Sequence, residues 1–369
     1  MNARRRIALV LGGGGLKGFA HIGVLRALEE RGVEPDVIAG TSIGALIAAA
    51  HAGGLAVEEM KRRALDLKRK DLFRVDRLGM LSSGTRTTSI YLQEPLRELV
   101  NSVTPAVHFD ALGRTLLVNT VDIEHGTQMV WGLPGLRGVS LPDAVYASCA
   151  LPGFFPPGRV GNRVCIDGGV IDNLPASIAA VHADAVIAVD VGSFDLQRAE
   201  AIEQRGFANV YMRSATVMMH ALQQFPFGAW SGPPMILIRP KLGHVSWLSF
   251  NHTAEVIEQG YRAASAALIH LDACLSEAGG VYPKRKVHLR VDPPKCIRCG
   301  ICIAMEPSLM AWGADGRAVA REPEVTWSPA DGEFVRHCPT NAIIAETTGT
   351  DQGAKAQENA TALAPSSGT

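Results

Sequence analysis

Three short segments of this sequence carry residues that together could cleave an ester. Ser42 lies in the run Gly40-Thr41-Ser42-Ile43-Gly44, Asp167-Gly168-Gly169 follows well downstream, and a glycine run from Gly12 to Gly15 precedes both. A serine in such a turn can attack a carbonyl, the aspartate can take its proton, and the glycines offer backbone N–H groups to an oxyanion. Their order in one chain predicts serine-dependent acyl transfer to water.

The serine run predicts a sharp turn between a strand and a helix. Gly40 and Gly44 flank Ser42 because side chains would clash in a turn this tight. An aliphatic segment at 37–39 precedes the turn, and the alanine-rich segment 43–52 that follows reads as a buried helix. Ser42 would then project at a helix N-terminus, where the helix dipole favours developing negative charge.

The glycine run allows two interpretations. The segment from Gly13 to Gly18 fits the G-x-G-x-x-G pattern of a dinucleotide-binding turn. That fold needs an acid at the end of the second strand, whereas Asp36 precedes the strand here and Ser42 follows it. We favour glycines that present bare N–H groups to a substrate, with Lys17 either holding the loop or lying solvated at the surface.

Asp167 is the candidate base. It follows a short apolar run and opens a turn, so we expect it at the carboxyl edge of a parallel sheet, although Asp-Gly-Gly can also be a simple turn. A carboxyl with a pKa near ~4 is a poor base at neutral pH, and burial would raise it. His244 and His252 follow Asp167, which leaves a Ser–Asp–His triad open. We assign no chemistry to His21.

Apolar runs and helical periodicity alternate over the first 275 or so residues, which predicts an α/β fold with a mostly parallel sheet covered on both faces. A helix is expected at 19–31. The expected strands lie at 7–11, 37–39, 116–121, 164–166, 185–190 and 235–239.

Four segments together resemble those of bacterial patatin-like phospholipases: Gly12 to Gly23, Gly40 to Gly44, Ala147 to Pro157, and Asp167 to Pro175. The resemblance extends from about Ile7 to Pro240. It implies a patatin-like three-layer sandwich that hydrolyses a phospholipid or lysophospholipid by a Ser–Asp dyad. It carries over Ser42 as nucleophile, Asp167 as base and the loop Gly13, Gly14 and Gly15 as oxyanion hole, supported by Lys17, Gly18, Gly40, Gly44, Gly168 and Gly169.

A second set of candidate ligands lies near the end of the chain. Cys296, Cys299 and Cys302 form Cys-x₂-Cys-x₂-Cys, and Cys338 precedes a proline. Three closely spaced thiolates and a remote fourth suit an iron–sulfur cluster, and a structural zinc site is the competing interpretation. Glu306 stands where a cysteine for a second cluster would be expected. The other cysteines, Cys149, Cys165 and Cys274, read as small buried apolar residues.

Residues 287–344 resemble single-cluster bacterial ferredoxins. The resemblance implies a small α+β ferredoxin-like domain that holds one [4Fe–4S] cluster on Cys296, Cys299, Cys302 and Cys338. A redox partner would follow, although the sequence does not say why such a cluster accompanies a hydrolase.

Composition divides the chain into three regions. We expect the acyl hydrolase domain at 1–280, the iron–sulfur domain at 286–346, and a disordered tail at 347–369 with no aromatic residue to build a core. Lys+Arg and Asp+Glu balance at 36 each, so bulk charge does not indicate a nucleic-acid partner.

The N-terminus is basic and then apolar, but the apolar run is too short for a signal peptide, and we expect a cytoplasmic protein. Peripheral contact with the inner membrane surface is a further expectation. Lys61-Arg62-Arg63 and Lys68-Arg69-Lys70 would lie over one face of a helix and could meet anionic lipid, or could simply be solvated.

Two further functions stay open. An electron-transfer protein could use a non-catalytic patatin-like domain to bind lipid or a partner, and a Ser–Asp–His esterase could use His244 or His252.

Overall fold

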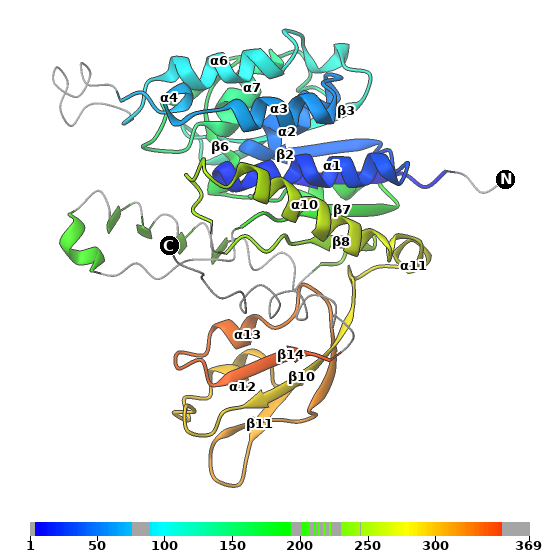
Figure 1. Ribbon diagram of the computed structural model, residues 1–369, viewed down its shortest axis with the longest axis vertical. Helices are drawn as coiled ribbons and strands as arrows, with labels where there is room; N and C mark the ends of the chain where they lie inside the picture. The colour runs from blue at the N-terminus through cyan, green and yellow to red at the C-terminus, as the bar shows by residue number, and fades with distance from the viewer. Residues whose placement is uncertain are drawn as a thin grey trace, which may run out of the picture. The chain divides into compact units, whose positions relative to one another are not determined.

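The structure, a computed structural model, describes residues 4–75, 89–192, 201–206, 230–243 and 245–348. It also describes the short segments 210–211, 213–214, 217–218 and 221–222. The chain divides into two compact units, Met1–Tyr282 and Pro283–Thr369 (Figure 1). The division falls within the Gly-, Pro- and Lys-rich stretch near residue 280.

The first unit is built on a central sheet with the strand order β5-β6-β3-β2-β1-β7-β8-β9, and β4 pairs with β3. Pairs along the path from β3 to β9 are parallel, whereas β3 meets β4 and β6 antiparallel, as β5 meets β6. The strands are β1 (Ile7–Leu11), β2 (Val37–Thr41), β3 (Thr115–Asp122), β4 (Thr127–Trp131), β5 (Gly158–Val160), β6 (Arg163–Asp167), β7 (Ala185–Val189), β8 (Met235–Ile238) and β9 (Val281–Tyr282).

Both faces of the central strands are covered. Every residue of β1, β2, β7 and β8 is buried. Because successive side chains of a strand point to opposite faces, uniform burial requires packing on both sides. This α/β architecture with a mostly parallel sheet agrees with the expectation from the sequence.

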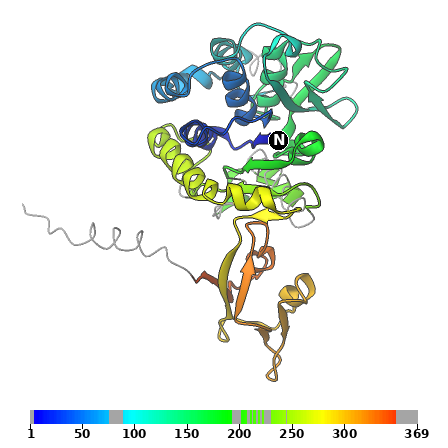
Figure 2. The ribbon, with the colours of Figure 1, turned by 90° about the vertical axis from the view of Figure 1, so that its right-hand side faces the viewer.

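Helices connect the strands and supply most of the cover. Figure 2 shows α1 and α10 side by side, and both also contact α3, while α2 packs on β1, β2 and β3. The longer helices are α1 (Ala20–Glu30), α2 (Ile43–Ala52), α3 (Val57–Asp66), α6 (Gln93–Val103), α7 (Leu141–Cys149) and α10 (Thr253–Leu268). The shorter ones are η1 (Gly15–Phe19), α4 (Arg69–Leu72), η3 (Phe109–Ala111), η4 (Gly168–Val170), α8 (Ala176–Ala179), η5 (Ala180–His182), η6 (Ile202–Arg205) and α11 (Leu271–Ser276).

Two strands meet end to end along one edge of β3. Residues 118–119 pair with both β2 and β4, and residues 120–122 pair with both β4 and β6, so β2 and β6 lie on the same side of β3. β2 ends at Thr41 opposite Asn119, and β6 approaches from the other direction and ends at Asp167 opposite Thr120. This register brings the ends of β2 and β6 together.

The direction of β6 differs from the expectation. Asp167 lies next to the carboxyl end of the parallel strand β2, as expected, but β6 itself runs antiparallel to β3. β5 and β6 form a hairpin. The two residues that connect them, 161–162, are too few for a parallel crossover, so β6 must run antiparallel to β5.

The prediction of one basic helix over residues 61–70 is wrong. α3 ends at Asp66, Leu67 and Lys68 are extended, and α4 is a separate single turn. The Asp71 carboxylate accepts the Lys68 N–H at 2.9 Å, which starts a new helix at this point. The two basic triplets therefore do not share one helix face.

The second unit contains helices and antiparallel strands around its own core. β10 (Arg285–Val291) lies between β13 (Glu324–Trp327) and β14 (Ile343–Thr347), and β11 (Met310–Trp312) pairs with β12 (Ala318–Ala320). α12 (Ile301–Met305) and α13 (Glu333–Arg336) complete it. Its core is formed by Val287, Leu289, Cys302, Met310, Ala318, Trp327, Phe334 and Ile343.

The first two residues of the segment expected to be a tail belong to the second unit. Thr347 is the last residue of β14, and the Thr348 N–H donates to the Lys286 carbonyl at 3.0 Å. Residues 349–369 lie outside the described part of the chain.

Candidate active site

Ser42 occupies a tight turn between β2 and α2. Its backbone has φ 56° and ψ −129°, a left-handed conformation that is unusual for serine. A Cβ at Gly44 would collide with the Leu11 carbonyl oxygen, and one at Gly40 would lie 2.6 Å from Ala45 N. The two glycines thus permit a turn that leaves Ser42 half-exposed at the N-terminus of α2.

Asp167 contacts Ser42 directly. The Ser42 side chain interacts with the Asp167 carboxylate and lowers its pKa, and the Gly169 N–H donates to Oδ1 at 2.8 Å. Asp167 is only 3% exposed. Burial raises the pKa of the Asp167 carboxyl to about 6, against the opposing effect of these two contacts. The carboxylate is therefore poised to exchange a proton near neutral pH.

The glycine loop lies beside the serine, and its N–H groups differ in availability. A Cβ at Gly13 would lie 3.1 Å from Ser42 Cβ. The Gly13 N–H donates to the Asn173 carbonyl at 3.3 Å, and Asn173 Nδ2 returns a bond to the Gly13 carbonyl at 3.0 Å. Among the residues that the structure describes, none accepts a hydrogen bond from the N–H of Gly14 or Gly15. These two half-exposed groups, at the start of η1, are the ones open to a ligand.

The residues after the loop hold it in place. The side chain of Lys17 is buried and lies against Gly192, where a Cβ would be 2.7 Å from Lys17 Cδ. Gly18 lies so close to Ile43 that a Cβ would collide with that side chain, so the loop packs directly on α2. Lys17 is thus part of the packed structure and is not a solvated lysine.

The His21 side chain holds the glycine loop in place. Its Nε2 lies 2.7 Å from the Gly12 carbonyl oxygen, and burial lowers the pKa of the ring to about 4. The imidazole is therefore neutral at physiological pH and donates to that carbonyl. His21 thus holds the backbone of the glycine loop, and we assign it no chemical role.

Three polar residues that the sequence reading did not single out support the turn. The buried Ser148 hydroxyl accepts the Ser42 N–H at 2.8 Å and donates to the Asn119 carbonyl at 2.7 Å. The Asn119 side chain donates to the Asp172 carbonyl at 2.6 Å. Asn173 bridges to Gly13 as described above. Ser148 and Asn173 belong to the motifs that carry the family resemblance, which was the available signal, whereas Asn119 gave none.

Gly168 and Gly169 form the turn after Asp167. Gly169 donates its N–H to the Asp167 carboxylate, and a Cβ at Gly168 would lie 2.5 Å from the Asn119 carbonyl oxygen. Close approach of η4 to β3 thus requires the small residue here.

Two residues of the competing interpretations have other contacts. The His252 ring is half-exposed and its Nδ1 lies 2.9 Å from the Glu255 carboxylate, while His244 falls outside the described residues. The Asp36 carboxylate accepts the Ile7 N–H at 2.9 Å, at the amino end of β1. A ribose-binding acid would be needed at the other end of β1, beside the glycine loop.

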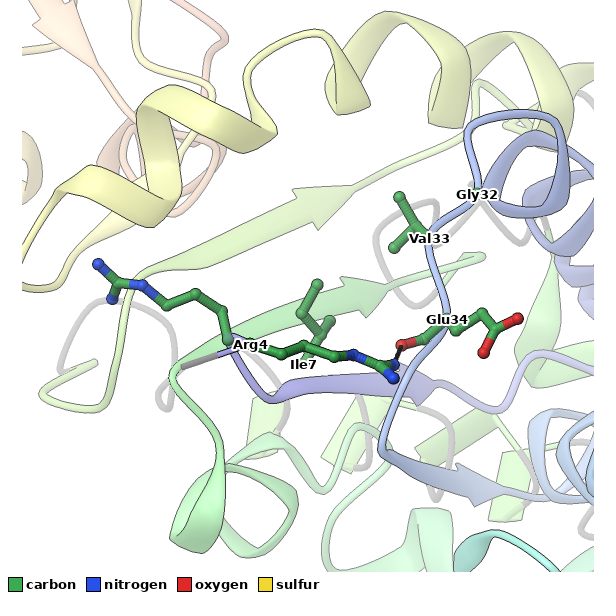
Figure 3. Close-up of a pocket in the computed structure, with 6 residues that line it drawn as sticks. Arg4, Ile7, Gly32, Val33 and Glu34 are labelled. Atoms are coloured by element: carbon green, nitrogen blue, oxygen red, sulfur yellow. Dashed lines mark hydrogen bonds between the residues drawn. The ribbon is translucent and has the colours of Figure 1, made fainter. Parts of the chain in front are cut away.

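A shallow pocket opens at this same amino end. It is lined by Arg4, Arg5, Ile7, Gly32, Val33 and Glu34, and Arg4 donates to the Glu34 carbonyl at 3.1 Å (Figure 3). Because Ile7 begins β1 and the glycine loop follows its last residue, this pocket is separate from the serine site.

The four candidate cluster ligands all lie in the second unit. Cys302 belongs to its core, Cys296 and Cys338 pack against that core, and Cys299 is exposed. The loop that carries the first three turns through Arg298 at φ 63° and Gly300 at φ 75°. The Ala342 N–H donates to Cys338 Sγ at 3.2 Å. None of the seven cysteines forms a disulfide, and Cys149, Cys165 and Cys274 are buried in the first unit, as expected.

One further group of possible metal ligands has a structural explanation. Asp122, Glu124 and His125 lie close together after β3. The Asp122 carboxylate accepts the Glu124 N–H at 3.0 Å and the Arg163 guanidinium at 2.9 Å. It therefore stabilises the turn between β3 and β4 and already has a cationic partner.

In the described part of the chain, every helix is too short or too polar to cross a bilayer.

Comparison with known proteins finds similarity to one family over the residues that carry this geometry. Residues 9–180 match the model of the family described as patatin-like phospholipase. An uncharacterized NTE family protein of Mycobacterium tuberculosis (strain ATCC 25618 / H37Rv) is 36% identical over 187 residues, which are 50% of this chain and 49% of the relative. Patatin-like phospholipase domain-containing protein 6 of Homo sapiens is 36% identical over 192 residues, 51% of this chain and 14% of that protein.

Lysophospholipase nte1 of Aspergillus fumigatus is 30% identical over 257 residues, 66% of this chain and 15% of that protein. The chain thus spans about half the length of the mycobacterial relative and far less of the other two. Among solved structures, VipD from Legionella pneumophila has a TM-score of 0.40 at 15% identity, covering 72% of this chain and 67% of that one, a likeness too low to add to the assignment. The chain contains a patatin-like phospholipase domain with homologues in the NTE family.

Proposed function

We propose that the first unit hydrolyses acyl ester bonds of phospholipids or lysophospholipids with a Ser42–Asp167 dyad. The contact between Ser42 and a buried carboxylate whose pKa is raised to about 6 is the observation that supports this most strongly. The substrate class follows the phospholipase and lysophospholipase relatives.

In this mechanism Ser42 Oγ attacks the acyl carbonyl carbon while its proton passes to Asp167. The carbonyl oxygen becomes an oxyanion, which the N–H groups of Gly14 and Gly15 would stabilise together with the N-terminus of α2. The C–O bond then breaks, and the departing alcohol takes the proton from Asp167. This leaves an acyl ester on Ser42.

Water completes the cycle. Asp167 takes a proton from the water as its oxygen attacks the acyl–Ser42 carbonyl, and the second oxyanion uses the same N–H groups. The Ser42 oxygen leaves and recovers its proton from Asp167, and the fatty acid is released. The raised pKa suits Asp167 for both directions of transfer, because general catalysis is most efficient near the operating pH.

The first experiment replaces the nucleophile. Ser42→Ala should abolish ester and phospholipid hydrolysis with an unchanged melting temperature, and a fluorophosphonate should label Ser42 in the native chain. Ser276→Ala, at the end of α11, is the matched control and should retain activity. Retained turnover in Ser42→Ala, or labelling of another serine, would contradict the assignment and favour a lipid- or partner-binding platform.

The same assay separates the dyad from a triad. If Asp167 acts directly on Ser42, His244→Ala and His252→Ala should each retain most of the activity. A loss at either histidine as large as that at Ser42 would favour a Ser–Asp–His esterase.

We further propose that the second unit holds one [4Fe–4S] cluster on Cys296, Cys299, Cys302 and Cys338. The donor set fits such a group, because Cys296, Cys302 and Cys338 lie in or against one small core, the exposed Cys299 lies between the first two in the same loop, and a backbone N–H already donates to Cys338 Sγ. When bound, the cluster would supply one-electron chemistry, and a redox partner is part of this proposal.

A further inference from the structure

The first unit exposes a set of apolar side chains near its serine site. Val75, Ile90 and Trp247 are 45%, 39% and 38% exposed. Residues 75 and 91 are bridged as an antiparallel pair, and the Ile90 N–H donates to the Gly153 carbonyl at 3.0 Å. Phe154, the next residue, packs edge-on to Trp247 with ring centroids 5.2 Å apart. The three exposed residues therefore lie on segments that contact one another.

A cluster of aromatic rings supports this surface from beneath. Ring centroids within it are 4.9 to 6.0 Å apart, the range in which aromatic side chains attract one another. Its members are Phe73, Tyr91, Phe154, Phe155 and Phe250. Exposed residues on such a base hold their positions without help from a ligand.

The surface adjoins the oxyanion loop. The Leu16 N–H donates to the Trp247 carbonyl at 2.8 Å, and a Cβ at Gly15 would lie 3.0 Å from Trp247 Cε3. Gly13, two residues earlier, lies against Ser42. A molecule held at Trp247 is therefore beside the groups proposed to act on an ester.

Cations stand at the other end of the surface. Lys68, Arg69 and Lys70 are all exposed, and no described acid lies within ion-pair distance of them. Arg69 also lies 5.5 Å above the Phe73 ring of the aromatic cluster. One acid, Asp71, shares this turn, and its carboxylate is bound to the Lys68 N–H. The local charge is positive.

The basic residues of α3, in contrast, form ion pairs with acids of the same helix. Lys61 pairs with Glu58 at 3.7 Å, and Arg62 and Arg63 both pair with Glu59 at 2.7 and 2.6 Å. Their charges are balanced within their own helix. Of the two basic triplets, only Lys68, Arg69 and Lys70 have no described acid within ion-pair distance and also adjoin the apolar surface.

We propose that this surface docks the first unit on an anionic phospholipid bilayer. Ile90 and Trp247 enter the headgroup region, and Lys68, Arg69 and Lys70 face the lipid phosphates. Tryptophan suits the boundary between water and acyl chains, and cations flanking apolar anchors are what an anionic interface attracts. The proposal rests on the proposed lipid hydrolysis, since docking here presents acyl esters to Ser42. Figure 1 shows α4 on the side of this unit opposite the start of the chain.

The test measures vesicle binding in a Ser42→Ala background, so that it does not depend on catalysis. Co-sedimentation is measured with phosphatidylglycerol vesicles and with phosphatidylcholine vesicles. Neutralising Lys68, Arg69 and Lys70 to Gln should weaken binding to the anionic vesicles by about five-fold per cation at low salt, and added salt should remove the difference. Ile90→Asp should weaken binding to both kinds of vesicle.

Matched controls keep the result specific. Val181→Asp replaces an apolar residue that is 67% exposed beside the amino end of β7, and Lys61→Gln with Arg62→Gln removes the paired charges of α3. Both should leave vesicle binding unchanged, and all variants should keep their melting temperature. Brominated lipid should quench the fluorescence of the protein more than that of Trp247→Phe.

Three outcomes would overturn the docking surface: unchanged binding in the α4 and Ile90 variants, equal loss in the controls, or displacement by inorganic phosphate at constant ionic strength without any effect of Ile90→Asp. The proposed hydrolysis fails by a different result, namely no ester turnover by the native chain. The two failures are thus distinguishable.

Discussion

Asp167 shows how a single buried side chain can serve catalysis and at the same time destabilise the fold. Its carboxyl has a pKa of about 6 in the folded chain against 3.8 when solvated. An acid whose folded pKa is raised binds more protons in the native state between these values. The free energy of unfolding therefore falls as pH rises from about 4 to 6, by roughly 3 kcal/mol, and stays reduced above pH 6.

The first prediction follows for Asp167→Asn. The variant should lose several orders of magnitude in hydrolysis yet unfold at higher urea concentration than the native chain above pH 6, with the difference vanishing near pH 4. The native rate should rise with pH around a midpoint near 6. Asp272→Asn, on the exposed first turn of α11, should change stability by less than about 0.5 kcal/mol. A pH-independent stability difference would show that Asp167 is already ionised without penalty.

The sequence could predict some residues of the site and not others, for physical reasons. Ser42 and Asp167 lie next to glycines. These glycines indicate tight turns, and they can be recognised from the sequence alone. Ser148 and Asn119 are an ordinary helical serine and an ordinary strand asparagine. Their contacts to the Ser42 turn exist only once α7 and β3 are in place.

At the scale of elements, the turn between β2 and α2 is the part of the fold that the sequence determines most clearly. β2, the Ser42 turn and α2 were predictable because apolar strand, glycine-flanked serine and alanine-rich helix follow one another directly. The direction of β6 and the break between α3 and α4 were not. Alternation of apolar residues is the same for both strand directions, and the break depends on the Asp71 cap at Lys68, which helical periodicity does not record.

The turn supplies the next prediction. Gly44→Ala should destabilise the first unit by about 1–3 kcal/mol, because its Cβ would collide with the Leu11 carbonyl oxygen. Hydrolysis should fall further than stability alone accounts for, since relief of the collision displaces Ser42. Gly113→Ala is the matched control, because no atom lies within 4 Å of its added Cβ. Urea unfolding and ester turnover measure the two effects, and equal behaviour of the two variants would refute the packing argument.

At the scale of the whole molecule, two units with separate cores share one chain. The main core of the first unit and the core around Cys302 have no residue in common. A small unit with so limited a core would draw much of its stability from a bound cluster.

The last prediction uses this separation. Anaerobically purified protein should contain about four irons and four sulfides per chain and be EPR-active when reduced. Cys338→Ala should lose the cluster and unfold the second unit, while Cys274→Ala, in the first unit, should keep the iron. Ester hydrolysis should persist in Cys338→Ala. A zinc-loaded, iron-free preparation would refute the cluster, and loss of hydrolysis with the cluster would show that the units are coupled.

The meeting of β2 and β6 along one edge of β3 has a consequence for synthesis on the ribosome. Ser42 and Asp167 come together only after Thr41 has paired beside Asn119 and Asp167 beside Thr120. A nascent chain that has exposed Ser42 but not yet β6 lacks the proposed base and the strand end that positions it. Hydrolytic competence would thus appear only after β6 has emerged and paired, so a nascent chain shorter than this could not attack the lipids around it.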